Sequence, residues 1–484
     1  MSLLRNSIVY VVLGFLAPAI NFLLLPLYTR YLAPEDYALI TLATLFQSVV
    51  TIFIGPGQPG SIGRIIFDHI HDKDEVHQLF STAIINTIFT GGMIFLLFLG
   101  IGDFVFRLAF KNNVFTFEKY GIFTLVYALI YNLQGIILTH YRNIEDVKKF
   151  VLWSVLFLLF SVGGIFTGVV ILQWKAYGNI SGRMIGLSIP ILMYLLYYYS
   201  RHKPYYSFKL DKSMLLYGLP LIPYSLTLFL NNNLDSLFIE RYLNLKLLGI
   251  FSMAVAISNI MEIFFNSVNN AINPTIFKLL LDQDNETNIR KIKGYYINYI
   301  LFTIIIILLC SICTGYIILL VIDDIYFPIL YLLPILFVSY IARVNSSIFG
   351  IPLFFFKKTN ILPIISIFTL IIGVAYDLFI IPKYAILGAA FSPLLMKESR
   401  VWLYIFFSSK YKLLDKSCYS LKKELYISYC ITLIISIFCI ISYNQEFLHF
   451  QLQLSLICIL LIFTIIFIYR KYLYENVYSS FIKK

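Results

Sequence analysis

Long apolar stretches separated by short polar breaks recur along the whole chain. A helix of about 20 apolar residues, rising 1.5 Å per residue, crosses the roughly 30 Å hydrocarbon layer of a bilayer. The pattern therefore predicts an all-α polytopic membrane protein of about fourteen spans. The expected spans are residues 8–28, 37–54, 79–101, 122–141, 150–172, 184–200, 214–238, 247–265, 296–322, 329–349, 361–381, 386–408, 426–443 and 452–469.

The composition excludes an ordinary soluble domain. Of the 484 residues, 60% are hydrophobic and 13% are charged, whereas a soluble domain is about 25% charged. The net charge of +12 is spread over many short loops, so we expect no nucleic-acid partner. The six cysteines include no CxxC pair, which predicts neither a disulfide framework nor a metal site.

The distribution of lysine and arginine predicts the orientation in the membrane. Basic residues resist translocation, so the loops that are rich in them stay in the cytoplasm. Both termini and every second loop hold 25 Lys and Arg, the other loops hold 9, and three lie inside spans. We therefore expect a multi-pass protein of the bacterial cytoplasmic (inner) membrane with both termini cytoplasmic.

The chain contains a weak internal repeat. A shift of 211 residues aligns Arg30-Tyr31-Leu32 with Arg241-Tyr242-Leu243, and the turn at residues 55–62 with residues 266–273. Parallel repeats of this kind occur in secondary transporters, which bind substrate between the halves. The repeat predicts two six-helix lobes and a terminal helix pair, at residues 1–205, 206–410 and 411–484.

The longest predicted loop is residues 266–295. It contains Asn273-Pro274, which favours a turn, followed by a polar segment of mixed charge. These features predict a short amphipathic helix on the cytoplasmic surface of the membrane.

Three basic residues within predicted spans are candidate substrate-binding groups. Arg343, Lys397 and Arg400 lie roughly 16 to 21 Å deep, and Lys397 and Arg400 share a helix face. Together they can form an electropositive wall for a diphosphate, with arginine offering paired donors to phosphate oxygens. The alternative is structural, with Glu398 neutralising one of the arginines or Arg400 extending towards the cytoplasm.

Acidic residues within spans are candidates for ion coupling. A carboxyl group in a partly dry pocket can bind and release a proton, which makes Asp235 and Glu262 candidate sites for H⁺ or Na⁺. The alternative is that each makes a hydrogen-bonded contact between helices. Asp377, close to an outer helix end, is expected to be exposed to water.

Several motifs resemble the Wzx-type flippases of O-antigen and capsule repeat units, within the multidrug/oligosaccharidyl-lipid/polysaccharide exporter superfamily. The first two spans carry LPLYTRYL at residues 25–32, PEDY at 34–37 and GSIGR at 60–64. The second lobe agrees through YGLPLIP at 217–223, NLD at 233–235 and LGIF at 248–251. The resemblance also points to Arg64 as a substrate contact, whereas a basic residue there could serve topology alone.

The resemblance implies a translocase and not an enzyme. Its substrate would be an undecaprenyl-pyrophosphate-linked oligosaccharide, moved across the membrane for lipopolysaccharide or capsule synthesis without a cofactor. Membrane lipids and the polysaccharide polymerase machinery are the other expected partners. Two alternatives remain, a membrane-embedded polymerase or ligase and a small-molecule drug exporter of the same superfamily.

Overall fold

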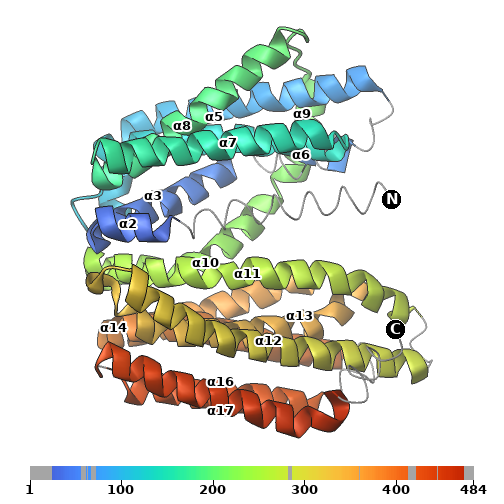
Figure 1. Cartoon of the computed structure of the whole chain (residues 1–484). Helices are drawn as coiled ribbons and strands as arrows, with labels where there is room; N and C mark the ends of the chain where they lie inside the picture. Colours follow the sequence, from blue (N-terminus) through green and yellow to red (C-terminus); the bar gives the residue numbers. More distant parts are fainter. Residues whose placement is uncertain are drawn as a thin grey trace. The chain divides into compact units, whose positions relative to one another are not determined.

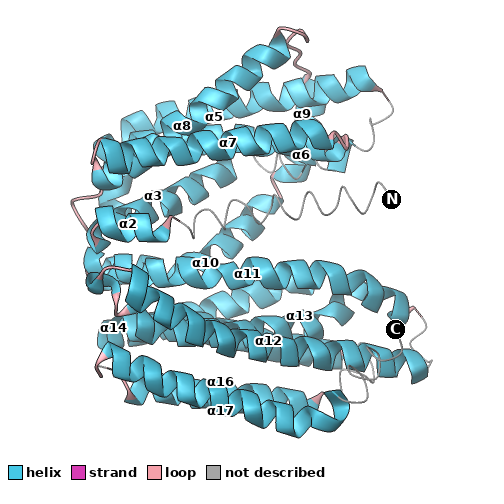
Figure 2. Ribbon diagram, in the orientation of Figure 1, coloured by secondary structure: helices cyan, strands magenta, loops and turns pink. Residues whose placement is uncertain are grey.

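The computed structural model describes residues 24–55, 61–62, 64–66, 72–281, 286–358, 360–411, 421–443 and 445–473. Within these residues the regular structure is helical and includes no strand (Figure 2). A helix satisfies its own backbone hydrogen bonds, which the hydrocarbon layer cannot supply. The predicted all-α fold is confirmed.

Contacts between residues divide the chain into two compact units, residues 1–252 (unit 1) and 253–484 (unit 2). The predicted lobes, with boundaries at residues 205 and 410, were defined by the sequence repeat and not by contacts, so they stay a prediction. The described helices of unit 1 are α2 (Leu25–Tyr31), α3 (Pro34–Phe53), α5 (Lys73–Ala109), η1 (Phe117–Gly121), α6 (Ile122–Asn143), α7 (Val147–Phe166), η2 (Thr167–Ile171), α8 (Lys175–Tyr199), α9 (Phe208–Gly218) and α10 (Leu221–Tyr242) (Figure 1).

Helix α11 (Leu245–Leu280) begins in unit 1 and continues into unit 2. Unit 2 also contains α12 (Glu286–Val321), η3 (Asp324–Tyr326), α13 (Ile329–Phe355), α14 (Ile361–Lys410), α16 (Lys422–Ile441) and α17 (Phe447–Leu473). Helix α13 forms the core of this unit. Its most apolar 18-residue window is 94% buried, against at most 56% for the other candidate spans of the described residues.

Eleven described helices are long and apolar enough to cross a membrane, or twelve if the bent pair α9 and α10 is one span. That pair bends by 45° beside Pro220, where proline interrupts the helical hydrogen bonds. A straight helix of the 50 residues in α14 would be about 75 Å long. Ala385, at φ 51° and ψ −137°, breaks α14 into the two spans predicted at residues 361–381 and 386–408. The predicted span 8–28 lies mostly outside the described residues.

The helix boundaries agree with the predicted repeat. Helix α2 ends at Tyr31 and α10 ends 211 residues later, at Tyr242. Helix α3 begins at Pro34 and α11 begins 211 residues later, at Leu245. The same helix-break-helix unit therefore occurs twice in the chain.

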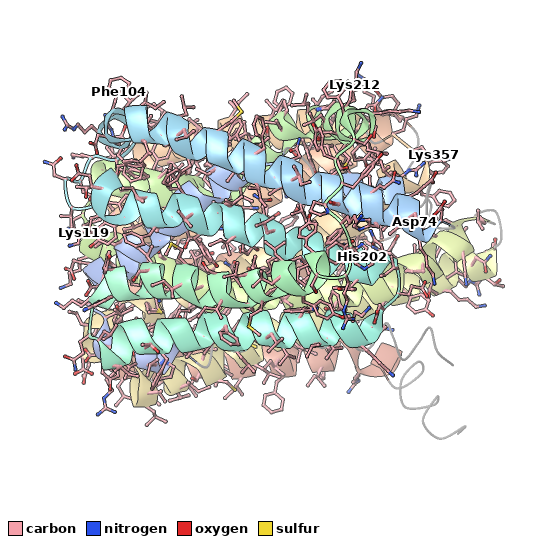
Figure 3. The ribbon with its side chains drawn as sticks, turned by 90° about the horizontal axis from the view of Figure 1, so that it is seen from above. Asp74, Phe104, Lys119, His202, Lys212 and Lys357 are labelled. Carbon is pink, nitrogen blue, oxygen red and sulfur yellow. The ribbon has the colours of Figure 1, made fainter. Side chains whose placement is uncertain are left out.

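Polar caps and loops lie at the ends of the helices in unit 1. The Asp72 carboxylate accepts hydrogen bonds from the amides of Asp74 and Glu75, and so fixes the start of α5. Figure 3 shows Asp74, His202 and Lys212 at one end of this unit, with Phe104 and Lys119 at the other. The loops before α5 and after α8 thus share a side, as the topology predicts.

Two predictions are wrong. The described part of the segment 266–295 forms no separate surface helix. It belongs to two long helices, because α11 continues to Leu280 and α12 begins at Glu286. Asp377 was expected to face water, but its side chain is fully buried within α14. Its place near the end of a predicted span did not reveal that other helices cover it.

Candidate functional site

A row of polar residues follows one face of α11 inside unit 2. Asn259, Glu262, Asn266 and Asn269 are spaced by three, four and three residues, which places them on the same side of a helix. Glu262 lies 17 residues after the first residue of α11, or about 26 Å along its axis. These polar groups therefore lie well inside a helix that is apolar enough to span a membrane.

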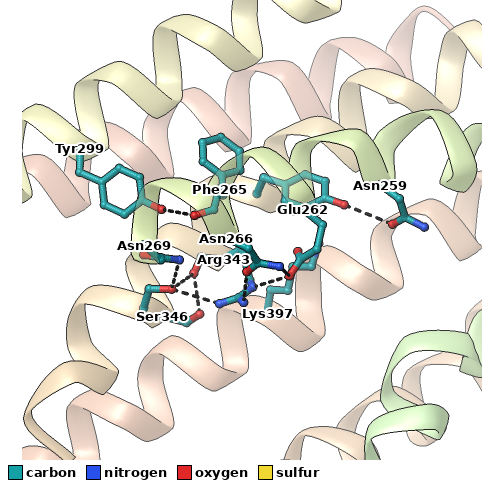
Figure 4. A network of polar contacts seen from close by, with 12 residues as sticks. Asn259, Glu262, Phe265, Asn266, Asn269, Tyr299, Arg343, Ser346 and Lys397 are labelled. Atoms are coloured by element: carbon teal, nitrogen blue, oxygen red, sulfur yellow. Dashed lines mark hydrogen bonds and ion pairs between the residues drawn. The ribbon is translucent and has the colours of Figure 1, made fainter. Parts of the chain in front are cut away.

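Arg343 of α13 is held by this polar face (Figure 4). Its Nε lies 3.2 Å from Oε1 of Glu262, forming an ion pair. One terminal nitrogen donates to Oδ1 of Asn266 at 3.2 Å, and the other donates to Oγ of Ser347 at 3.0 Å. Asn269 also donates to Ser347, at 3.2 Å. The three guanidinium nitrogens thus each have a separate acceptor.

The Arg343–Glu262 pair is only partly enclosed. The side chains are 27% and 36% exposed, respectively. Charges are costly in hydrocarbon, so intramembrane ionisable groups face other protein groups or a water-filled space. The pair joins α11 to α13, the central helix of unit 2, and about a third of each side chain remains accessible beside that contact.

Lys397 of α14 joins the same network. Its Nζ donates to Oγ of Ser339 at 2.9 Å and lies 3.9 Å from the centre of the Tyr340 ring. The Tyr340 hydroxyl in turn donates to Oδ1 of Asn259 at 3.4 Å, which connects α13 to α11. Cation–π contact and a hydrogen bond therefore hold the ammonium group beside the Arg343–Glu262 pair.

The structure thus brings two predicted substrate-binding residues, Arg343 and Lys397, together with a predicted ion-coupling residue, Glu262. Arg400 is half-buried one helical turn beyond Lys397. Glu262, and not Glu398, neutralises Arg343, so the cationic wall is reduced by one charge while this pair is closed. The roles proposed for these side chains stay predictions.

The other two predicted site residues belong to unit 1. Asp235 is buried in α10, with 8% of its surface exposed. Arg64 is exposed on the helical stretch 64–66. Its neighbours Ile62 and Ile66 pack into the hydrophobic core of unit 1. Each has interactions of its own, and their suggested functions stay predictions.

The repeat shows what is special about this network. The 211-residue shift relates Glu262 to Thr51 of α3, and Arg343 to Asn132 of α6. In unit 1 the Asn132 amide donates to the backbone carbonyl of Thr51 at 3.3 Å. The same two positions therefore touch in both halves, through a neutral contact in unit 1 and an ion pair in unit 2.

Sequence reasoning missed the residues that complete the network. Asn266 and Ser347 lie four residues after Glu262 and Arg343, respectively, so i to i+4 spacing from each charged residue was the available signal. No comparable signal singled out Tyr340, whose ring contact with Lys397 depends on how α13 and α14 pack.

Comparisons with known proteins agree with this architecture. Lipid II flippase MurJ in an inward closed conformation superposes with a TM-score of 0.67 at 14% identity, covering 97% of this chain and 100% of that chain. An inward-facing multidrug resistance MATE family transporter gives a TM-score of 0.64 at 15% identity, covering 82% of this chain and 94% of the other. At these identities the likeness establishes the fold.

Sequence comparison identifies relatives and a family. An Lsg locus protein of Haemophilus influenzae is 26% identical over 292 residues, which are 58% of this chain and 67% of that protein. An uncharacterized membrane protein of the same species is 22% identical over 289 residues, or 58% of this chain and 66% of its own length. The family model described as polysaccharide biosynthesis protein matches residues 3–280, more than half of the chain. The protein is therefore a multi-pass membrane protein that belongs to the polysaccharide biosynthesis protein family.

Proposed function

We propose that this protein translocates an undecaprenyl-pyrophosphate-linked oligosaccharide repeat unit across the cytoplasmic membrane for surface polysaccharide synthesis. Membership of the polysaccharide biosynthesis family supports a role in that pathway, and the MurJ-like fold supports movement of a lipid-linked substrate. The single observation that carries the proposal is the partly exposed Arg343–Glu262 pair inside unit 2.

Exchange of partners at Arg343 provides the binding step. The diphosphate of the substrate competes with Glu262, because arginine forms paired hydrogen bonds to phosphate as well as to carboxylate. Lys397 and Arg400 on α14 add charge beside Arg343, and Arg64 receives the head group at the cytoplasmic side. Rocking of the two lobes then exposes the sugar outward, while the polyprenyl tail stays in lipid.

The same exchange couples transport to an ion. The diphosphate frees the Glu262 carboxylate from Arg343, and in the outward-facing state this carboxylate binds a proton or Na⁺ from outside, which neutralises its charge. After the substrate has left, the lobes return to the inward-facing state, the ion is released into the cytoplasm, and Glu262 pairs with Arg343 again. Asp235 in α10 is the second candidate for this ion-coupling role.

The test is replacement of Arg343, Lys397 and Arg400 by alanine together. We expect loss of surface glycan at an unchanged amount of membrane-inserted protein, measured in a deletion strain that carries the variant. Lys410→Ala is the matched control, because Lys410 is an exposed cation at the end of the same helix α14. Normal surface glycan in the triple variant would remove the proposal.

Drug export is the second candidate, favoured by the likeness to a MATE transporter. Expression in a drug-sensitive host distinguishes the two functions. A flippase restores surface glycan without raising drug resistance, whereas an exporter does the reverse. If the protein were a polymerase or ligase, its loss would leave transport of the repeat units intact. Only the length of the polymer or its attachment would change.

A further inference from the structure

Arg183 is a further intramembrane cation, and it lies in unit 1. The predicted span began at residue 184, which placed Arg183 in a loop. Helix α8 instead begins at Lys175, so Arg183 lies eight residues into a candidate membrane span, about 12 Å along the axis. Because a charge at this depth needs a polar partner, its surroundings matter.

Tyrosines from three other helices lie near Arg183. The hydroxyls near enough to interact with its charge are those of Tyr28 in α2, Tyr37 in α3 and Tyr127 in α6. The rings of Tyr28 and Tyr37 lie 6.3 Å apart between centroids. Arg183 forms no ion pair within the described part of the chain, whereas Arg343 has Glu262. Its positive charge is therefore not balanced by a carboxylate there.

This tyrosine cluster has more hydrogen-bond donors than acceptors. A guanidinium offers five N–H groups and no acceptor, and each phenol adds one O–H. Nε of Arg183 is buried and has no hydrogen-bond partner among the residues that the structure describes. The hydroxyl of Tyr28 is buried as well and lies beside the same guanidinium. A ligand rich in acceptor oxygens and carrying negative charge would satisfy both groups.

The repeat places a related cation in unit 2. The 211-residue shift takes position 183 to 394, one helical turn from Lys397. Lys397 contacts the ring of Tyr340 on α13, and the charge of Arg183 interacts with Tyr127 on α6, two positions away from the repeat equivalent of Tyr340. In unit 2 the network also contains the carboxylate of Glu262. The cation in unit 1 also has tyrosines near it, but it forms no ion pair with an acid of the described residues.

We infer that Arg183 and the hydroxyls of Tyr28, Tyr37 and Tyr127 form a second substrate site, which binds an oxyanion of the lipid-linked oligosaccharide. The inference rests on the proposed function and adds a contact in unit 1. A diphosphate and the carboxylate of an acidic sugar share the required chemistry, two oxygens in one plane that accept from the guanidinium. Tyrosine hydroxyls supply further donors to the same oxygens.

Binding to the full-length protein in lipid nanodiscs tests the inference. The probes are undecaprenyl diphosphate and trigalacturonate, applied to the wild type, Arg183→Gln and Arg107→Gln. Arg107 is an exposed arginine in the last turn of α5 and serves as the matched control. We expect Arg183→Gln to raise the Kd of at least one probe by about tenfold or more, as loss of a charge-assisted hydrogen bond implies, and Arg107→Gln to leave it unchanged.

Further variants separate binding from a structural role. Arg183→Lys keeps the charge and should bind more tightly than Arg183→Gln, and Tyr28→Phe should weaken binding without removing the ring. If only the binding of undecaprenyl diphosphate depends on Arg183, the ligand is the diphosphate. If only the binding of trigalacturonate depends on Arg183, the ligand is an acidic sugar. If Arg183→Gln lowers the melting temperature while Tyr28→Phe and Arg183→Lys bind both probes like the wild type, the site is structural and the inference is wrong.

The outcome is distinguishable from failure of the proposed function. If Arg183→Gln binds both probes like the wild type while surface glycan still requires Arg343, the inference alone fails. If the wild type binds neither probe, the inference is also overturned. If the wild type itself does not restore surface glycan to a deletion strain, the proposed function fails, and the inference fails with it.

Discussion

Replacing the ion pair by its counterpart from the other half of the repeat gives a decisive test of the network in unit 2. The double variant Glu262→Thr/Arg343→Asn installs the residues found at the equivalent positions Thr51 and Asn132. In unit 1 these residues make a neutral contact between the corresponding helices at 3.3 Å. The variant therefore removes both charges while keeping a contact that this chain already uses.

The magnitude follows from the partial exposure of the pair. An exposed ion pair contributes about 0–1 kcal/mol, and removing one partner of a buried pair costs about 3–5 kcal/mol. With side chains 27% and 36% exposed, we expect each single variant, Glu262→Gln or Arg343→Gln, to lose about 1–3 kcal/mol of stability. The double variant should stay within about 1 kcal/mol of the wild type, because no unpaired charge remains.

The assay combines unfolding in detergent micelles with surface-glycan complementation of a deletion strain. The double variant should fold and insert like the wild type but produce at least tenfold less surface glycan, since Arg343 can no longer bind an oxyanion. Surface glycan at the wild-type level would refute the role of the ion pair in transport. A double variant less stable than both single variants would refute the charge argument.

Three further predictions concern packing, loop anchoring and topology. Gly164→Ala should destabilise the α7–α8 pair by about 1–3 kcal/mol, because a Cβ there would lie 2.1 Å from the carbonyl oxygen of Gly182. Glu240→Gln should lower thermal stability by about 1–3 kcal/mol, because its buried carboxylate accepts three hydrogen bonds from the loop after α5. A topology reporter fused after Glu286 should give a cytoplasmic signal.

Each of these predictions has a control or an opposing result. Gly163→Ala should not lower stability, because nothing lies within 4 Å of a Cβ at that position and alanine favours a helix more than glycine does. Equal melting temperatures for Gly163→Ala and Gly164→Ala would contradict the packing argument. An unchanged melting temperature for Glu240→Gln would show that the loop is held by other contacts. A periplasmic signal from the fusion would reverse the predicted topology.

The sequence by itself determined the spans and their repetition. Each membrane helix satisfies its own backbone, so its existence depends on local apolar composition, which can be read along the chain. The break at Ala385 fell between two predicted spans, and the offset of 211 residues recurred in the ends of α2 and α10. These properties depend on residues that are close together in the chain.

Only the tertiary structure decided which polar side chains meet. Glu262 and Arg343 are 81 residues apart, and hydropathy does not specify which faces of α11 and α13 approach each other. The same limit explains Asp377, which is covered by neighbouring helices, and Arg183, which lies inside a helix that begins earlier than its apolar run. Pairing of helix faces is a long-range property, set by side-chain packing across the whole bundle.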